Sequence, residues 1–202
     1  NADIRAVMGQ NANLLVGTRG AGAFRSTDRG ETWISVNSGL SNPVVLAFAG
    51  DASHVFAGTV SGVYRSSDNG DSWAHADSGM ELMATYALAS SSRVLIAGTW
   101  DGMFRSTDDG EYWEAANSGM TIHSRFVWSL AARDRSIFTG TQVGVFLSTN
   151  EGTDWTWAGL STQHVHSLAI HGTDLFAGTD SGLFHSSDLG VQWSPASSLG
   201  KR

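Results

Sequence analysis

The two histidines of "HVH" at 164–166 have a spacing that could bind a metal ion. Residues two apart in an extended strand point to the same side, so the two imidazoles would be neighbours. No third ligand is evident, because the chain has no Cys and His171 falls at the far end of the same segment. We therefore interpret His164 and His166 as solvated or capping side chains, and we expect no metal and no cofactor.

A second candidate for ion binding is the pattern Ser-x-Asp-x-Gly-x-x-Trp, whose polar composition is that of a short calcium loop. A calcium loop spaces its oxygen ligands over about a dozen residues and commonly ends on a bidentate Glu. This pattern is too short to provide such a set of ligands. We interpret it as a structural turn and name each copy a box turn. The copies are "STDRGETW" (26–33), "SSDNGDSW" (66–73), "STDDGEYW" (106–113), "STNEGTDW" (148–155) and "SSDLGVQW" (186–193).

The box turns reveal an internal repeat that fills the chain. Their Trp residues follow one another at intervals of 40, 40, 42 and 38 residues, and a segment ending in Gly-Thr precedes every copy. A period near 40 residues is typical of propeller blades. We predict an all-β fold, a single β-propeller over 1–202 with five four-stranded blades. The expected blades are approximately 1–37, 38–77, 78–117, 118–159 and 160–202.

Each unit is predicted to form four short strands, A to D. In the second unit these are 44–50, 54–59, 62–67 and 72–76, separated by clusters of Gly, Ser, Asn and Asp that favour turns. No segment has a sustained 3.6-residue period, so we expect almost no helix. The box turn then joins strands C and D of every blade.

The conserved parts of the box turn have simple structural roles. The Asp and Ser side chains can accept hydrogen bonds from the turn's own N–H groups, Gly supplies a positive φ, and Trp folds back as an apolar anchor. The expected structural residues are Asp28, Gly30, Trp33, Asp68, Gly70, Trp73, Asp108, Gly110, Trp113, Asn150, Gly152, Trp155, Asp188, Gly190 and Trp193. Asn150 replaces Asp in the fourth unit, but its amide oxygen can still accept one bond.

The five box turns resemble the Asp-box (BNR) repeat. This repeat is similar to those of sialidases, sortilin-type receptors, several bacterial lectins and a family of photosystem-assembly factors. The resemblance covers all five units and implies a β-propeller with an Asp box in each C–D turn. Because these families do different things on one scaffold, the resemblance implies no single function.

Differences among the units gather on the face opposite the box turns, which we name the divergent face. In a meander, the B–C and D–A connections lie on the opposite face from the A–B and C–D turns. Directly after each Gly-Thr, in the B–C turn, stand Arg19, Val60, Trp100, Gln142 and Asp180. Near the start of strand A stand Arg5, Leu46, Tyr86, Trp128 and His166. Neighbouring columns are uniformly small or apolar, as expected of a core.

Aromatic rings beside charged groups make the divergent face a plausible surface for a sugar or another small ligand. The candidate ligand-binding residues are Arg19, Tyr86, Trp100, Asp101, Arg125, Trp128, Gln142, His166 and Asp180. We predict a non-catalytic, lectin-like module that binds a glycan or a protein. The alternative for the strand-A column is that its side chains simply plug the centre of the propeller.

Two other functions stay open. The resemblance to sialidases implies an arginine cluster, a Tyr–Glu nucleophile pair and an Asp acid. The divergent face offers Arg5, Arg19, Arg125, Tyr86, Glu81 and Asp101 for these roles. The Arg-Ile-Pro motif of such enzymes is absent, so a glycoside hydrolase is the alternative rather than the leading prediction. A protein-assembly scaffold is the other.

Composition excludes some partners. The formal net charge of -7 and the scattered Arg residues give no basic patch for nucleic acid. No apolar run approaches the roughly 20 residues of a membrane span. The first residues lack the layout of a signal peptide, and a Cys-free chain suits either redox compartment. We expect a secreted or periplasmic location.

Contacts between blades are the last expectation. Arg25, Arg65 and Arg105 precede the first three box turns, and we predict that they make polar contacts between blades. The first unit starts at strand A and the fifth ends with strand D, so no strand is left to complete another blade. We expect a closed disc held by side-chain packing. The alternatives are an oligomer and a fragment of a larger propeller.

Overall fold

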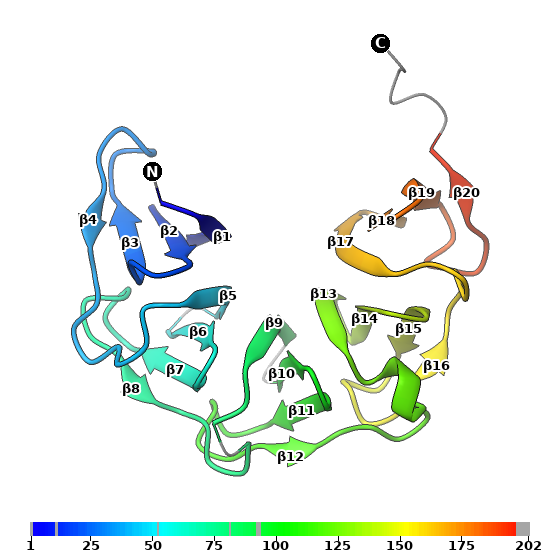
Figure 1. Ribbon diagram of the computed structural model, residues 1–202, viewed down its shortest axis with the longest axis horizontal. Coiled ribbons are helices and arrows are strands. Elements are labelled where there is room, and N and C mark those ends of the chain that lie inside the picture. Colours follow the sequence, from blue (N-terminus) through cyan, green and yellow to red (C-terminus); the bar gives the residue numbers. More distant parts are fainter. Residues whose placement is uncertain (1, 11, 52, 81, 92–93, 197–202) are drawn as a thin grey trace.

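The computed structural model contains five antiparallel sheets of four strands, arranged side by side in an arc (Figure 1). It describes residues 2–10, 12–51, 53–80, 82–91 and 94–196. In every sheet the strand order follows the chain order, as in a meander. The all-β, five-bladed propeller predicted from the repeat is therefore confirmed.

The first three blades have nearly identical strand lengths. Blade 1 comprises β1 (Ile4–Gln10), β2 (Asn13–Thr18), β3 (Ala23–Ser26) and β4 (Ile34–Ser35). Blade 2 comprises β5 (Val45–Gly50), β6 (Val55–Thr59), β7 (Gly62–Ser66) and β8 (Ala74–His75). Blade 3 comprises β9 (Thr85–Ser91), β10 (Val94–Thr99), β11 (Gly102–Ser106) and β12 (Glu114–Ala115).

The last two blades follow the same plan. Blade 4 comprises β13 (Val127–Arg133), β14 (Ser136–Thr141), β15 (Gly144–Ser148) and β16 (Thr156–Trp157). Blade 5 comprises β17 (Val165–His171), β18 (Asp174–Thr179), β19 (Gly182–Ser186) and β20 (Ser194–Pro195). A single 3₁₀ turn, η1 (Ile122–Ser124), lies in the long connection between blades 3 and 4. Helix is otherwise absent from the described residues, as predicted.

The box turns are built from hydrogen bonds inside the turn, as expected. In blade 2, Asp68 Oδ1 accepts from the Ser72 N–H at 2.9 Å, and Ser66 Oγ accepts from the Gly70 N–H at 2.8 Å while donating to Asp68 Oδ1. The other four turns repeat this arrangement, including the one in which Asn150 Oδ1 accepts from the Asp154 N–H. The box turn is therefore a structural part, and Asn replaces Asp without changing it.

The repeat pattern predicted only one of the two left-handed backbone positions in these turns. The box Gly residues have φ between 81° and 95°, as predicted. The residue before each Gly is also left-handed, with φ between 56° and 62° at Arg29, Asn69, Asp109, Glu151 and Leu189. Non-glycine residues adopt this conformation at some cost, so the Ser and Asp bonds have to hold both residues in place.

The box Trp residues join neighbouring blades as well as covering their own turns. Each indole N–H of blades 2 to 5 donates to a carbonyl at the end of strand D in the preceding blade. The pairs are Trp73 to Val36, Trp113 to Ala76, Trp155 to Ala116 and Trp193 to Ala158, at 2.7–2.8 Å. Trp33, in the first blade of this chain, donates instead to Gly30 of its own turn at 3.1 Å and is 40% exposed.

A glycine socket makes the second contact between blades. The Gly of Gly-Thr in strand B faces the first strand of the next blade, and an added Cβ on Gly17 would lie 2.6 Å from Cγ1 of Val45. The same clash would occur between Gly58 and Thr85 and between Gly140 and Val165. Because no side chain larger than hydrogen fits, glycine lets the blades approach closely.

The predicted arginine contacts between blades are present in blades 1 to 3. Arg25 donates to the Asn69 carbonyl, Arg65 to the Asp109 carbonyl, and Arg105 to the Glu151 carbonyl, at 2.8–3.0 Å. Each acceptor lies in the box turn of the following blade. These arginines therefore link blades, and the structure gives them no part in a site.

The prediction of a closed disc is wrong. Inner strands β1, β5, β9, β13 and β17 contact one another in series, but Figure 1 shows blade 1 and blade 5 standing apart at the two ends of the arc. As a consequence of the open arc, Ile4, Val7 and Trp33 of blade 1 are 57%, 68% and 40% exposed. In the described part of the chain, no helix is long or apolar enough to cross a bilayer.

Candidate functional site

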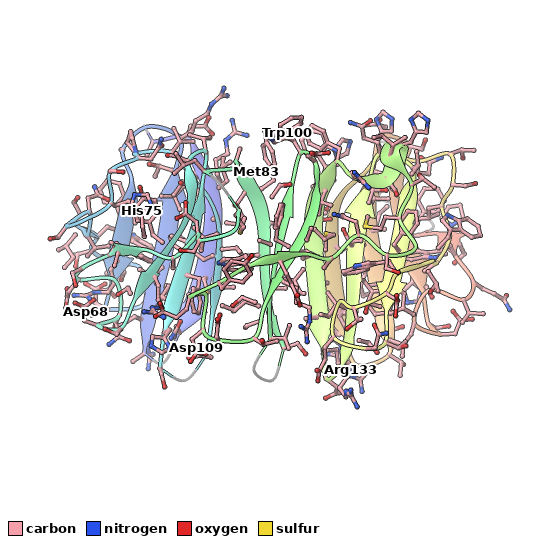
Figure 2. All side chains as sticks on the ribbon, turned by 90° about the horizontal axis from the view of Figure 1, so that it is seen from below. Asp68, His75, Met83, Trp100, Asp109 and Arg133 are labelled. Carbon is pink, nitrogen blue, oxygen red and sulfur yellow. The ribbon has the colours of Figure 1, made fainter. Side chains whose placement is uncertain are left out.

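The connections between strands lie on two opposite faces of the arc, as expected of a meander. Figure 2 shows the box-turn residues Asp68 and Asp109 at one face and Trp100, in a B–C turn, at the other. Arg133, at the end of a strand A, lies on the side of the box turns. The divergent face is therefore built by connections that carry no box turn.

A β-bulge places the divergent column of strand A at this face. In all five blades the pairing of strands A and B skips one residue of strand A, between Ile4 and Ala6 in blade 1 for example. The skipped residues are Arg5, Leu46, Tyr86, Trp128 and His166. A bulge frees a residue from the ladder and redirects its side chain, which is why bulges recur next to binding sites.

The five bulged residues surround one hollow of about 450 Å³ at the inner edge of the arc. Arg19, Val44 and Val60 complete its lining, so every blade contributes at least one residue. We name this the central hollow. Its size is that of a small-molecule site, whose usual range begins at about 300 Å³.

Aromatic rings form one side of the central hollow. The rings of Phe126 and Trp128 are 4.2 Å apart between centroids, and Tyr86 is 5.4 Å from Phe126 and 6.0 Å from Trp128. The His166 ring meets Trp128 edge-on at 5.8 Å. Trp128 Nε1 is buried and has no hydrogen-bond partner among the described residues. A ligand with an acceptor at this point would satisfy it.

Charged groups form the two ends of the hollow. Arg5 pairs with Asp3 at 2.7 Å, whereas the exposed guanidinium of Arg19 makes no contact of this kind within the described residues. At the other end, Asp180 lies 2.6 Å from His166 Nε2 and 3.2 Å from His164 Nδ1. The hydrogen bond from His166 lowers the pKa of Asp180. This carboxylate therefore remains charged and fixes the two imidazoles in place.

The structure brings together about half of the predicted site residues. Arg19, Tyr86, Trp128 and His166 line the central hollow, and Asp180 contacts it through His166. Four others do not line it: Trp100, Asp101, Arg125 and Gln142. Trp100 is 55% exposed on the same face, and Asp101 and Gln142 are exposed in B–C turns. The Nε atom of Arg125 is buried without a partner among the described residues.

Sequence reasoning missed Phe126, the ring that connects Tyr86 to Trp128. Phe126 lies two residues before Trp128, and residues two apart in an extended chain share a side. The signal was present in the sequence, because the residues two positions before the strand-A column also differ among the units: Asp3, Val44, Ala84, Phe126 and His164. Glu81, one of the sialidase-like candidates, lies outside the described residues.

The described lining of the central hollow consists of aromatic, aliphatic, arginine and histidine side chains. None of the described residues that line it is a carboxylic acid. Glycoside hydrolysis commonly needs two carboxyl groups, one of them protonated. Asp180, the nearest carboxylate, has a lowered pKa and is therefore a poor proton donor at neutral pH.

A separate group of polar residues lies on the face of the box turns, between blades 2 and 3. Ligand atoms of Asp51, His54 and Asp109 all come within 4.8 Å of one another. Asp51 Oδ1 already accepts from the backbone N–H groups of Ser53 and His54, and the Arg65 guanidinium is bonded to the Asp109 carbonyl. A neighbouring cation opposes a metal ion here, so we read the group as a polar contact between blades.

These features define the chain as a β-propeller protein with an aromatic and basic hollow on one face. No family model matches the chain, and no curated protein does. Among solved structures it is similar to an ancestral GH74 enzyme, with 20% identity and a TM-score of 0.78 over 96% of this chain and 31% of that one. It is equally similar to the extracellular domain of a putative one-component system of B. thetaiotaomicron, with 20% identity and a TM-score of 0.78 over 95% of this chain and 27% of that one.

A third similar structure is YCF48 bound to a D1 peptide, with 14% identity and a TM-score of 0.72 over 96% of this chain and 68% of that one. The chain thus spans less than a third of the first two proteins and about two thirds of the third. At these identities the likeness concerns the fold alone, since one propeller scaffold serves unrelated functions.

Proposed function

We propose that this chain is a non-catalytic binding module that takes a carbohydrate in the central hollow. The observation that carries the proposal is the convergence of five bulged side chains, one from each blade, on a single hollow of about 450 Å³. The repeat makes the surrounding positions alike and these five different. Such a departure from internal symmetry favours a ligand over simple packing.

The residue types favour a sugar. The apolar face of a pyranose ring packs well against aromatic rings such as Tyr86 and Trp128, and its hydroxyl groups can accept from donors that the protein leaves unpaired. Arg19 and the Trp128 indole N–H are donors of this kind within the described residues. A hollow without a carboxylic acid in its described lining binds such a ring and leaves its glycosidic bond intact.

A glycan array followed by calorimetry tests the proposal. We expect binding that weakens at least about tenfold in Trp128→Ala and in Arg19→Ala, because each removes a principal contact of a small site. Arg19 is exposed, so its variant should fold normally. Trp100→Ala is the matched control, since this Trp is 55% exposed on the same face but outside the hollow.

Two results would contradict the proposal. One is an array on which no glycan binds. The other is binding that Trp128→Ala and Arg19→Ala leave unchanged, which would move the site elsewhere. A panel of fluorogenic glycosides, sialosides included, addresses the hydrolase alternative, and we expect no turnover of any member.

A protein segment is the second candidate ligand. YCF48, one of the similar structures, is bound to a D1 peptide. The exposed Trp100 and the unpaired Arg19 are residue types that dominate protein interfaces. A peptide would extend beyond the hollow, so Trp100→Ala should then weaken binding as much as Trp128→Ala. The pattern of the same variants therefore separates a peptide ligand from a glycan.

A secreted or periplasmic location fits this proposal. One of the similar structures is an extracellular domain, and glycans are abundant outside the cytoplasm. Because the chain has no Cys, it folds without a disulfide and needs no oxidising compartment. Fractionation of producing cells would show whether the protein leaves the cytoplasm.

A further inference from the structure

At three of the four junctions between blades, an arginine of one blade fills a site formed by the box turn of the next. Arg25, Arg65 and Arg105 each stand one residue before the end of strand C. Each donates to the carbonyl of the left-handed residue in the following box turn, at 2.8–3.0 Å. A carboxylate completes each contact, and the pairs are Arg25 with Asp71, Arg65 with Glu111 and Arg105 with Glu114. The repeat therefore contains a site for a guanidinium group, which it fills from within.

The fourth junction, between blades 4 and 5, keeps the acceptor of this contact and lacks the arginine. Leu147 stands at the arginine position, and its side chain has no donor. The corresponding acceptor is the carbonyl of Leu189, whose φ of 56° matches that of the other left-handed residues. Within the described ranges no group donates to this carbonyl. Val191 stands where the preceding junctions have Asp71 and Glu111, so the carboxylate is also replaced.

These replacements leave a hollow of about 230 Å³ between β16 and the box turn of blade 5. We name it the rim hollow, because β16 lies with β4, β8 and β12 along the outer edge of the arc (Figure 1). Leu147, Trp157, Leu189 and Val191 contribute to its lining, and the described residues that line it are all uncharged. Blades 4 and 5 contact each other through β13 and β17, so the rim hollow belongs to an internal junction.

An exposed tryptophan borders the rim hollow. Trp157 pairs with Phe146, at the position held by Ser35, His75 and Ala115 in the first three blades. Trp157 is 57% exposed, and Val191 on the blade 5 side is 78% exposed. Both positions are exposed in all five blades, so this exposure is a property of the outer edge and not of the last blade. The fourth junction therefore has an accessible aromatic and aliphatic surface beside its unpaired carbonyl.

We propose that the rim hollow binds an arginine side chain of a partner protein, in the position that an internal arginine fills at the other three junctions. The guanidinium would donate to the Leu189 carbonyl. The Trp157 indole would replace the carboxylate, since the face of an indole ring attracts a guanidinium. The methylene groups of the arginine would pack on Leu147 and Val191. The net charge of -7 also favours the approach of a cationic segment.

The choice of arginine follows from two requirements of the rim hollow. An aliphatic side chain would match the apolar walls, but it would exclude water from the Leu189 carbonyl and leave this acceptor unpaired. A lysine ammonium is a compact, strongly hydrated point charge. The planar guanidinium can instead donate along its edge while its face lies on an aromatic ring. Arginine is therefore the side chain that satisfies both the carbonyl and Trp157.

An NMR titration of the isotope-labelled whole chain with N-acetyl-arginine methylamide tests the proposal, because this probe carries one guanidinium and no other charge. We expect saturable shifts of the Trp157 indole N–H and of the Gly190 and Val191 amides. The dissociation constant should be about 1–10 mM, since one side chain makes few contacts. The corresponding derivatives of citrulline, lysine and norleucine should each bind at least about fivefold more weakly.

Three substitutions taken from other blades make the test specific. Leu147→Arg supplies the internal arginine of blades 1 to 3, so it should fill the rim hollow and weaken probe binding at least about tenfold. Trp157→Ser supplies the residue of blade 1 and should weaken binding at least about fivefold, read from the Gly190 amide. Tyr112→Ser is the matched control, because Tyr112 is 60% exposed outside the rim hollow and blade 2 has Ser72 at this position. Circular dichroism verifies that each variant is folded.

Three outcomes would overturn the proposal. The first is the absence of saturable shifts at the rim hollow with the arginine probe at up to about 50 mM. The second is binding that Leu147→Arg or Trp157→Ser leaves unchanged, which would place the probe elsewhere. The third is a citrulline, lysine or norleucine derivative that binds as tightly as the arginine probe. Glycan binding in the central hollow is measured with other ligands and other variants, so failure here leaves the proposed function unaffected.

Discussion

At the scale of single residues, the box-turn carboxylates are held in their charged form by the turn itself. The Ser72 hydroxyl donates to Asp68 at 2.5 Å and lowers the pKa of Asp68 from 3.8 to about 2. The Thr32 hydroxyl likewise lowers the pKa of Asp28, and backbone N–H groups lower the pKa values of Asp108 and Asp188. Four box-turn carboxylates therefore couple folding to pH in the same direction.

The sign of that coupling gives a prediction. A carboxylate whose pKa is lower in the folded state stabilises the fold above its unfolded pKa, and this stabilisation is lost as pH falls through the folded pKa. We expect the unfolding midpoint in urea to drop between about pH 4 and about pH 2. Asp68→Asn should lose less stability over this interval than the unaltered chain, since the amide cannot titrate and Asn150 shows that it fits the turn.

Asp101→Asn is the control for this titration, because it removes an exposed carboxylate outside the box turns. It should follow the unaltered chain across the interval. Equal losses of stability for Asp68→Asn and the unaltered chain would refute the role of the turn bonds in holding the charge.

Residue roles inside the box turn could be read from the sequence because they are local. Acceptors two to four positions from their donors need no knowledge of the fold, and the Asp, Ser and Gly roles were predicted correctly. The left-handed backbone before each Gly was not predicted, since Arg, Asn, Asp, Glu and Leu all occupy it. No residue type at this position indicates the left-handed conformation, because the turn imposes it.

At the scale of elements, the box Trp links neighbouring sheets as well as packing on its own turn. Trp113 is completely buried and its indole N–H donates to the Ala76 carbonyl of the preceding blade at 2.7 Å. The sequence predicted an apolar anchor but could not show what it anchors. The partner lies 37 residues earlier in the chain, and only the packing of blades reveals the contact.

Replacement of this Trp measures how much the contact between blades contributes to stability. Trp113→Phe leaves the Ala76 carbonyl without its donor and a cavity beside it, so we expect a loss of about 2–4 kcal/mol in the free energy of unfolding. Trp33→Phe, the same change at an exposed copy, should cost less than about 1 kcal/mol. Urea unfolding at low protein concentration compares the two, and equal losses would mean that the contact between blades contributes nothing.

The central hollow could be predicted in part from the sequence. Comparing the units identified the strand-A column, and the structure gathers all five of its members around the central hollow. The sequence did not show that a bulge sets each of these residues free from the ladder. It also could not separate Trp100 from Trp128, because both are divergent aromatics and only the curvature of the arc decides which one faces inward.

At the scale of the whole molecule, burial decreases from the middle of the arc toward its ends. Every residue of β10 in blade 3 is buried, whereas β18 in blade 5 has only two buried residues. A stack of repeats is stabilised by contacts between neighbours, and end units have one neighbour instead of two. The open arc therefore has a stability gradient that a closed disc would lack.

Hydrogen exchange at low protein concentration would reveal this gradient. We expect the amides of β9 and β10 to exchange most slowly, and those of β17 and β18 to exchange faster by at least about tenfold, since end blades open without unfolding the centre. Blade 1 should also exchange faster than blade 3. Uniform protection in all five blades would argue for a single cooperative unit.

The fold of the chain as a whole was predictable because the period and the turn chemistry repeat five times. Closure of the propeller into a disc was not predictable, because it depends on the small angle between neighbouring blades. No residue pattern encodes that angle directly. The two open ends are the physical sign of the error: Ile4 and Trp33 occupy positions that are buried in the middle blades, yet the structure leaves them exposed.

Each blade takes its four strands from one uninterrupted segment, and side-chain packing together with isolated backbone bonds, such as the bridge between Arg19 and Val44, joins it to the next blade. No sheet has to be cut when a segment of about 40 residues is inserted or deleted between blades. Duplication within the gene can therefore change the number of blades in whole steps without disturbing any existing strand pairing.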